Sequence, residues 1–182
     1  MTRFPVPSRN DVSEANQQLF DALKKGLGVV PNLYATLAHN PTALGDYLTL
    51  QNRTSTLTAR EREVVNLVVS QVNDCRYCLS AHTVIGRMNG FTEEQILDIR
   101  AGSASFDARL DALARFVRTV TERRGHPTGD AVDAVLAAGF TSANIVDIVI
   151  TIGDKTITNF LHGITQVPID FPLAPELQLQ NA

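Results

Sequence analysis

Hydrophobic residues recur along most of the chain at intervals of three and four, which places them on one face of an α-helix. Most of these segments start at a capping residue or a proline, and several end at glycine. No segment shows the sustained alternation between hairpin turns that is typical of strands. The pattern predicts an all-α, single-domain helical bundle of about eight or nine helices, at residues 13–28, 31–40, 41–54, 58–73, 75–90, 92–102, 107–125, 128–139 and 141–163.

Several of these predicted helices start with recognisable capping residues. Thr58 is followed three residues later by Glu61, which forms a capping box. The segments at 90–99 and 139–148 share the pattern Gly-Phe-Thr-x-x-Gln/Asn-Ile-x-Asp-Ile, in which the glycine ends one helix and the threonine caps the next. After the last helix, residues 166–182 contain three prolines. We expect this tail to be extended and to wrap over the domain or a neighbouring subunit.

The composition is that of a globular protein, with 44% hydrophobic and 19% charged residues in a chain of 182. This length favours one domain spanning residues 1–182. The net charge of −3 and the lack of a basic cluster argue against nucleic-acid binding. No apolar run approaches the roughly 20 residues needed to span a bilayer, and the first residues lack the apolar segment of a secretory signal. We therefore expect a cytoplasmic, reducing environment.

Both cysteines of the chain lie in the stretch 73–83, in the spacing Cys75-x-x-Cys78-x-x-x-His82. With Asn73 or Asp74 as N-cap, the two cysteines fall on one face of a helix, close enough for a disulfide. The start of a helix also stabilises a thiolate. His82 lies one turn after Cys78 and two turns after Cys75, so we assign Cys78 as the attacking thiol and Cys75 as the resolving thiol.

Other uses of this motif are less well supported. Attachment of a c-type haem requires histidine directly after the second cysteine, where Leu79 stands. A thioredoxin fold requires a βαβ context that the helical surroundings do not offer. A structural zinc site needs a fourth ligand, which would have to come from a distant histidine or Glu63. Two core cysteines would leave the redox spacing unexplained. We therefore expect neither a metal nor a cofactor.

A polar line runs along the preceding helix, which is otherwise apolar on most of its circumference. It consists of Glu63, Asn66, Ser70 and Asn73. This line is either the solvent-facing side of the helix, the interpretation we favour for Asn66, or a face turned toward the cysteine helix. In the second case Glu63 would orient His82 or pass its proton through a water. Periodicity alone leaves the two interpretations evenly balanced.

The complete line, Glu63 followed by eleven residues and then Cys75-x-x-Cys78-x-x-x-His82, resembles the alkylhydroperoxidase D and carboxymuconolactone decarboxylase superfamily. The segments VPNLYATLAHNPTAL and TNFLHGITQVPID also look like parts of that family. The resemblance implies an all-helical fold and a homo-oligomer, such as a dimer, trimer or hexamer. It further implies a cofactor-free thiol peroxidase that takes a hydroperoxide as substrate and a dithiol or lipoyl-type reductant.

In the implied cycle, Cys78 attacks the peroxide and becomes a sulfenic acid, Cys75 condenses with it to a disulfide, and Glu63 and His82 relay protons. Authentic alkylhydroperoxidase D has a histidine next to the second cysteine, whereas Tyr77 stands here, as in a peroxidase-related branch with a CxYC motif. Tyr77 motivates an alternative function, a redox-sensing or disulfide-exchange protein with little peroxidase turnover. Decarboxylases of the superfamily generally lack the cysteine pair, which argues against lactone decarboxylation.

Several polar residues outside the motif have less specific expectations. His39 and His126 precede turns at Pro41 and Pro127, and we expect both to be structural or exposed. His162 is expected to be a buried or interface histidine. The charged residues of the last helix, Asp147, Asp154 and Lys155, interrupt an apolar sequence. We expect them to pair between helices or at a subunit interface.

Overall fold

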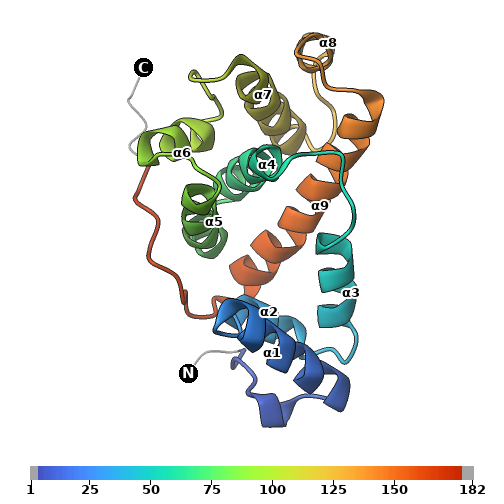
Figure 1. Cartoon of the computed structure of the whole chain (residues 1–182), viewed down its shortest axis with the longest axis vertical. Helices are drawn as coiled ribbons and strands as arrows, with labels where there is room; N and C mark the ends of the chain where they lie inside the picture. Colours follow the sequence, from blue (N-terminus) through green and yellow to red (C-terminus); the bar gives the residue numbers. More distant parts are fainter. Residues whose placement is uncertain (1–3, 178–182) are drawn as a thin grey trace.

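The computed structural model describes residues 4–177, and within this range it contains α-helices and one 3-10 helix but no strand (Figure 1). The all-α prediction is therefore confirmed, as are nine α-helices in the described part of the chain. The elements are η1 (Arg9–Asp11), α1 (Glu14–Leu27), α2 (Asn32–Leu37), α3 (Ala43–Gln51), α4 (Ala59–Val72), α5 (Arg76–Met88), α6 (Glu93–Arg100), α7 (Ala108–Glu122), α8 (Gly129–Ala137) and α9 (Ser142–Thr165).

The predicted capping residues start their helices. Thr58, Thr92 and Thr141 each form a capping box with the residue three positions later. The repeated glycines Gly90 and Gly139 adopt φ values of 83° and 88°, which side-chain-bearing residues rarely reach. The repeated pattern is thus one local solution, used twice, for ending a helix and starting the next.

Helix α4 lies at the centre of the larger helical group and packs against α5, α6, α7 and α9 (Figure 1). Four of its valines, Val64, Val65, Val68 and Val69, and Leu67 are almost completely buried, at 0–1% exposure. A helix enclosed on most sides needs apolar residues around most of its circumference. This explains why α4 has a β-branched, strand-like sequence and still forms a helix.

Helices α1, α2 and α3 form a smaller group around the C-terminal half of α9 (Figure 1). Phe20, Ala35, Ala38 and Leu44 make up its core. The connection from α3 to α4 is tied to α9 by Asp147, which accepts hydrogen bonds from Arg53 Nη1 at 2.5 Å and from Thr56 Oγ1 at 2.7 Å. Asp147 therefore pairs α9 with the α3–α4 connection, rather than with another helix.

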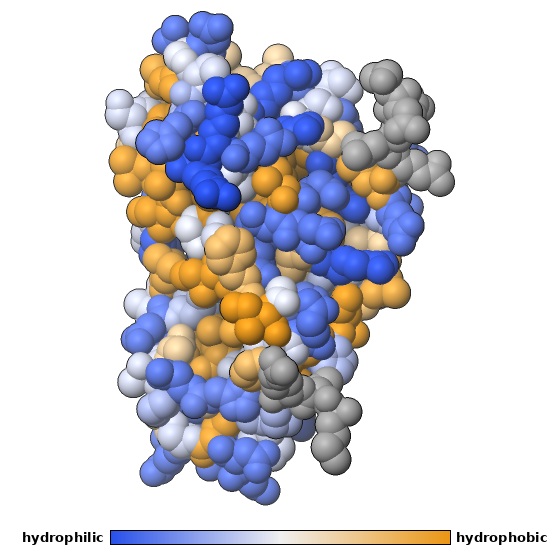
Figure 2. Space-filling view, turned by 180° about the vertical axis from the view of Figure 1, so that it is seen from behind, coloured by the Kyte–Doolittle hydropathy of each residue, from blue (hydrophilic) through white to orange (hydrophobic). Residues whose placement is uncertain are grey.

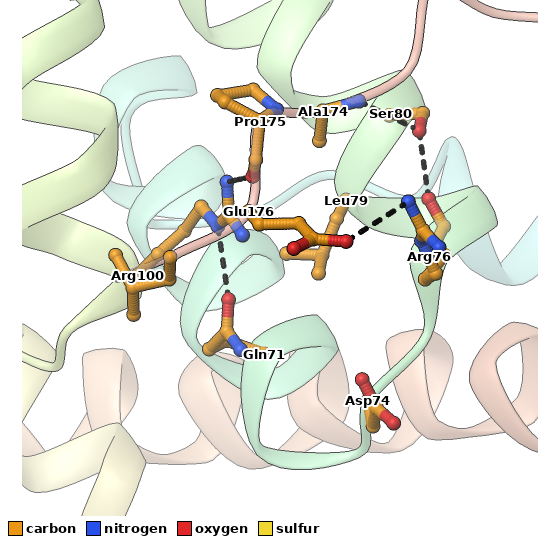
Figure 3. Close-up of a pocket in the computed structure, with 10 residues that line it drawn as sticks. Gln71, Asp74, Arg76, Leu79, Ser80, Arg100, Ala174, Pro175 and Glu176 are labelled. Carbon is orange, nitrogen blue, oxygen red and sulfur yellow. Dashed lines mark hydrogen bonds and ion pairs between the residues drawn. The ribbon is translucent and has the colours of Figure 1, made fainter. Parts of the chain in front are cut away.

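The chain after α9 is extended to residue 177 and runs back over its own domain, as predicted, whereas the last part of the predicted tail, 178–182, lies outside the described residues, as do residues 1–3. Asp170, Ala174 and Pro175 anchor the tail to α2, α5 and α6. Figure 3 shows Arg100 donating to both Pro175 and Gln71, and the backbone of Ala174 donating to Ser80. These contacts enclose a cavity of about 280 Å³, lined by neither cysteine.

The surface carries several exposed apolar side chains, five of them on α9: Val146, Val149, Ile157, Phe160 and Ile164. Figure 2 shows hydrophobic residues gathered at mid-height on one face, among hydrophilic ones. Of the helices in residues 4–177, none is by itself long and apolar enough to cross a membrane. Helices α8 and α9 reach the required length and hydropathy only when taken together, and they are bent by 118°.

Candidate active site

The two cysteines lie where α4 turns into α5. The backbone of Cys75 donates to Ser70 O at 2.9 Å, and Asp74 adopts a left-handed conformation with φ of 50°. The N-cap of α5 is Cys75 itself, and not Asn73 or Asp74 as the sequence suggested. Asn73 instead ends α4, because the turn between the two helices uses residues 73–75 and leaves none for a separate cap. Cys78 is consequently the third residue of α5, within the first turn.

Both cysteines are buried and free, with no disulfide between them. Cys75 Sγ accepts a hydrogen bond from the backbone N of Cys78 at 3.4 Å. A hydrogen bond from the Cys75 thiol, together with the charges of Lys155 and His82, lowers the pKa of Cys78 to about 5. The same hydrogen bond, with burial, raises the pKa of Cys75 well above its usual value. The pair is therefore divided into a thiolate at Cys78 and a thiol at Cys75, as the assignment of attacking and resolving residues requires.

His82 pairs with Glu63 across the contact between α5 and α4. Its Nδ1 lies 2.8 Å from Glu63 Oε2, and the amide of Asn66 donates to the other carboxylate oxygen at 3.0 Å. Burial alone would raise the pKa of Glu63, but the charge of His82 and these hydrogen bonds outweigh it, so that pKa lies below its usual value. Because Glu63 holds Nδ1, Nε2 is the ring nitrogen left for proton transfer.

The polar line on α4 faces the protein interior. Asn66 is 92% buried (8% exposed), so its predicted position on the solvent face is wrong. Further along the line, the amide of Asn73 donates to Asn159 Oδ1 at 2.9 Å, and Asn159 Nδ2 lies 3.4 Å from Ser70 Oγ. These contacts join α4 to α9 beside the cysteines. The periodicity correctly grouped these polar residues on one face of α4. The burial of that face depends on packing against α5 and α9, which the periodicity of α4 does not show.

A cavity of about 600 Å³ opens onto Cys78 and His82. Most of its wall is apolar, formed by residues such as Leu33, Ala81 and Ile85, with the rings of Tyr34, Tyr47, Tyr77 and Phe171. Cys75 does not line it. An incoming substrate therefore meets the sulfur of Cys78 first, and Cys75 lies behind it.

Lys155 is a functional candidate that the sequence analysis placed elsewhere. It lines the same cavity as Cys78 and is only 3% exposed. Burial would lower the pKa of this ammonium, but the negative charges of Cys78 and Asp154 outweigh burial and raise the pKa, so Lys155 is a cation. The expected role in interhelical or interface pairing misses this position beside the thiolate. The signal was present in the sequence, since Lys155 is the only lysine outside α1 and stands in an apolar helix.

Tyr77 stands at the position of the missing relay histidine, and its hydroxyl is engaged in contacts with other segments of the chain. Its hydroxyl donates to Asp170 Oδ1 at 2.6 Å and accepts from the backbone N of Leu33 at 3.2 Å. The ring packs edge-on against Phe171, with centroids 5.6 Å apart. Tyr77 therefore joins the cysteine helix to α2 and to the C-terminal tail.

The remaining three histidines, all within the described residues, make no hydrogen bond to either cysteine. His162 is buried, as expected, with Nε2 3.2 Å from Val167 O. The His39 ring contacts Pro5 O at 2.9 Å, and His126 is exposed. Among residues 4–177, no three histidine, cysteine, aspartate or glutamate side chains are grouped so that they could hold a metal ion.

Comparison with known families agrees with this arrangement. Residues 36–119, which include Glu63, both cysteines and His82, match the carboxymuconolactone decarboxylase family. A solved structure named for an alkylhydroperoxidase D core shares the fold over almost the whole chain. The family match covers residues 36–119, and the solved structures show an alkylhydroperoxidase D-like fold for almost the whole chain. No curated protein matches it significantly in sequence.

Two solved structures that share this fold are of peroxidase-related proteins. One, an alkylhydroperoxidase D core protein from Ralstonia eutropha JMP134, aligns with a TM-score of 0.83 at 23% identity, covering 93% of this chain and 92% of its own. The other, from Silicibacter sp. TM1040, aligns with a TM-score of 0.78 at 24% identity, covering 94% and 90%. A debrominase, Bmp8, has the same fold at 16% identity, with a TM-score of 0.76 and 93% of each chain covered. At these identities the comparison establishes the alkylhydroperoxidase D-like fold.

Proposed function

We propose that this protein is a cofactor-free thiol peroxidase that reduces hydroperoxides with Cys78 and Cys75. The observation that carries the proposal is the division of the cysteine pair, because the thiolate of Cys78 lines the cavity and the thiol of Cys75 lies directly behind it. A nucleophile facing the substrate and a protonated partner within reach are what a two-cysteine peroxidase needs.

The chemistry proceeds in three steps. The Cys78 thiolate attacks the terminal peroxide oxygen, so that an S–O bond forms, the O–O bond breaks, and sulfur is oxidised while the peroxide is reduced to an alkoxide. His82, protonated at Nε2, gives the alkoxide its proton. The Cys75 thiol then displaces the hydroxyl of the sulfenic acid as water, which forms the disulfide. A dithiol or lipoyl-type donor reduces this disulfide by thiol–disulfide exchange.

Lys155 and Glu63 support these steps without forming a bond to the substrate. The buried ammonium of Lys155 stabilises negative charge on Cys78, as the start of helix α5 does. Glu63 fixes the orientation of the imidazole through Nδ1. Asn66 in turn holds Glu63. Each of these partners is buried, which strengthens the electrostatic interactions among them.

The cavity favours organic hydroperoxides over hydrogen peroxide. The cavity has a volume of about 600 Å³, and its wall is formed mainly by aliphatic and aromatic side chains. Such a wall gains free energy by burying an alkyl or aryl group, and hydrogen peroxide has none to bury. The substrate class that follows is a hydroperoxide with an apolar substituent.

The alternative is a redox-sensing or disulfide-exchange protein with little turnover, and the fold does not choose between the two. A debrominase also has this fold. Tyr77 favours the alternative in one respect, because it provides no histidine between the cysteines. The His82–Glu63 pair favours turnover, since it supplies a proton donor at the cavity wall.

Steady-state consumption of cumene hydroperoxide with a dithiol donor distinguishes these functions. The peroxidase proposal requires turnover well above the rate of the donor alone, with loss of turnover in Cys78→Ser and in Cys75→Ser. A sensor would form the Cys75–Cys78 disulfide once and then consume peroxide near the background rate. If Cys78→Ser keeps full activity, the proposed chemistry is wrong.

A further inference from the structure

A second cavity, of about 410 Å³, also borders His82 but is not lined by Cys78. His82 lines both cavities, but Cys78 lines only the apolar one and Glu63 only the second one. The wall of the second cavity is rich in polar groups, contributed by the α3–α4 connection, α4 and α9, and includes Arg53, Arg62, Asn66, Thr151 and Asp154. The imidazole–carboxylate pair thus borders a largely apolar cavity and a more polar one, and Tyr34, Gln51, Ile85 and Asn89 also line both.

Two buried acceptors in this polar wall have no hydrogen-bond partner among the described residues. They are Asn66 Oδ1 and Asp154 Oδ1, in side chains that are 8% and 9% exposed. An unpaired buried acceptor costs about 1–3 kcal/mol, so such groups are normally satisfied by ordered water. A polar cavity that offers several partners is large enough for a group of water molecules.

The proposed peroxidase cycle needs protons at His82 while the apolar cavity is occupied. Attack by a thiolate on a peroxide leaves an alkoxide, which takes one proton from the site. Reduction of the disulfide by a dithiol returns one proton when Cys78 is released as a thiolate. The apolar cavity offers few polar groups that could carry a proton, whereas the second cavity offers several, which favours the second cavity for this exchange.

We propose that the polar cavity is the proton entrance of the site and that Asp154 passes protons through water to Glu63 and His82. The inference rests on the proposed peroxidase function. Asp154 is suited to this task because it is an acidic residue in the wall that Glu63 and His82 also line. Its neighbour Lys155 lines the other cavity with Cys78. Adjacent residues of α9 therefore serve two compartments, one for the thiolate and one for the proton.

Comparing the rates of two reactions of the Cys78 sulfur distinguishes an effect on proton delivery from an effect on the thiolate itself. Attack on a hydroperoxide needs a proton for the leaving alkoxide, whereas alkylation by iodoacetamide releases iodide, which needs none. Both rates are measured in single turnover on the reduced protein, at about pH 8, where a thiol with a depressed pKa is fully ionised. Cumene hydroperoxide is the peroxide, and the Cys75→Ser background prevents disulfide formation in both reactions.

Asp154→Asn is expected to slow the peroxide reaction by about 10- to 100-fold, in the range of a lost proton-transfer group, and to leave alkylation within about twofold. Asp154→Ala is the second variant, because it removes the carboxylate and favours the helix; its free energy of unfolding is measured beside that of wild type, since Asp154 also helps to hold the Lys155 ammonium. Thr151→Val is the matched control, since it changes the same wall but removes a hydroxyl already bonded within α9. It is expected to leave both rates unchanged.

The experiment distinguishes failure of the proton-entrance proposal from failure of the peroxidase proposal. Wild-type protein that does not consume the peroxide contradicts the peroxidase proposal itself. Wild-type protein that reacts, with both Asp154 variants matching it in the peroxide reaction, overturns the proton entrance. Equal slowing of peroxide reaction and alkylation also overturns it, because it shows that Asp154 acts on the thiolate. Selective slowing of the peroxide reaction in both variants supports it.

Discussion

The hydroxyl of Tyr77 donates a 2.6 Å hydrogen bond to Asp170, which connects the helix of the cysteines to the C-terminal tail. The other oxygen of Asp170 accepts from the backbone N of Asn32 at 2.7 Å, so three segments meet at one carboxylate. Phe171, the next residue of the tail, lines the cavity of Cys78. The residue that replaces a relay histidine therefore has a structural task at the edge of the cavity.

Tyr77→Phe tests this structural role. Loss of the hydroxyl removes its hydrogen bonds to Asp170 and Leu33, which is expected to lower the free energy of unfolding by about 1–2 kcal/mol. Hydrogen exchange in the tail should become faster, whereas the pH profile of Cys78 alkylation and the single-turnover peroxide rate should stay within about twofold of wild type. A large loss of the peroxide rate with an unchanged tail would instead make Tyr77 part of the proton relay.

Lys155→Met is expected to weaken the thiolate of Cys78. The pKa of Cys78 is lowered to about 5 in part by the charge of Lys155, and loss of a buried neighbouring cation raises a thiol pKa by roughly one to two units. The rate of alkylation rises with pH as the thiolate forms, so its midpoint should move upward by that amount. Lys25→Met, which makes the same change on the exposed surface of α1, is the control, and a common midpoint for all three proteins would contradict the role.

Ala81→Leu should change substrate preference by narrowing the apolar cavity. Ala81 lies in its wall, one residue before His82, and is buried. Adding three carbons is expected to reduce kcat/KM for cumene hydroperoxide by about tenfold or more, since overpacking a filled site costs about 1–3 kcal/mol. Hydrogen peroxide should be much less affected. Equal losses for both peroxides would show that the cavity does not receive the substituent.

Asp147→Asn tests the link between α9 and the α3–α4 connection. Arg53 and Thr56 both donate hydrogen bonds to this carboxylate, and the contacts with Thr56 and Arg53 lower its pKa well below the usual value. Removing the charge should lower the free energy of unfolding near neutral pH by about 2–4 kcal/mol. Because the folded pKa is depressed, this contribution is present above about pH 4 and is lost as the pH falls further. Denaturant unfolding at several pH values should show the two proteins converging in acid.

The sequence predicted the helices well because their signals are local. Capping boxes at Thr58, Thr92 and Thr141 involve residues three positions apart, and each formed as expected. The helix start at the cysteines was missed by one or two residues. There Cys75 is the N-cap of α5, and its backbone N donates a hydrogen bond to Ser70 O in the tight α4–α5 turn. No capping pattern in the sequence indicates this hydrogen bond.

The site was predictable only where its residues are tied to one another by spacing. Glu63, Cys78 and His82 lie on two consecutive helices, and the family spacing brought them together correctly. Lys155 and Asn159 come from α9, far along the chain, and their approach depends on how α9 crosses α4 and α5. The burial of Asn66 and the anchoring of Tyr77 by the tail likewise require the tertiary structure.

Trapping of the sulfenic acid tests the central claim most directly. Cys75→Ser protein is treated with one equivalent of cumene hydroperoxide in the presence of dimedone, and the labelled residue is located by peptide mass spectrometry. Attack by Cys78 predicts a dimedone adduct on Cys78, formed in proportion to the peroxide consumed, and no adduct in a protein that also carries Cys78→Ser. Consumption of the peroxide without an adduct on Cys78 would contradict the account.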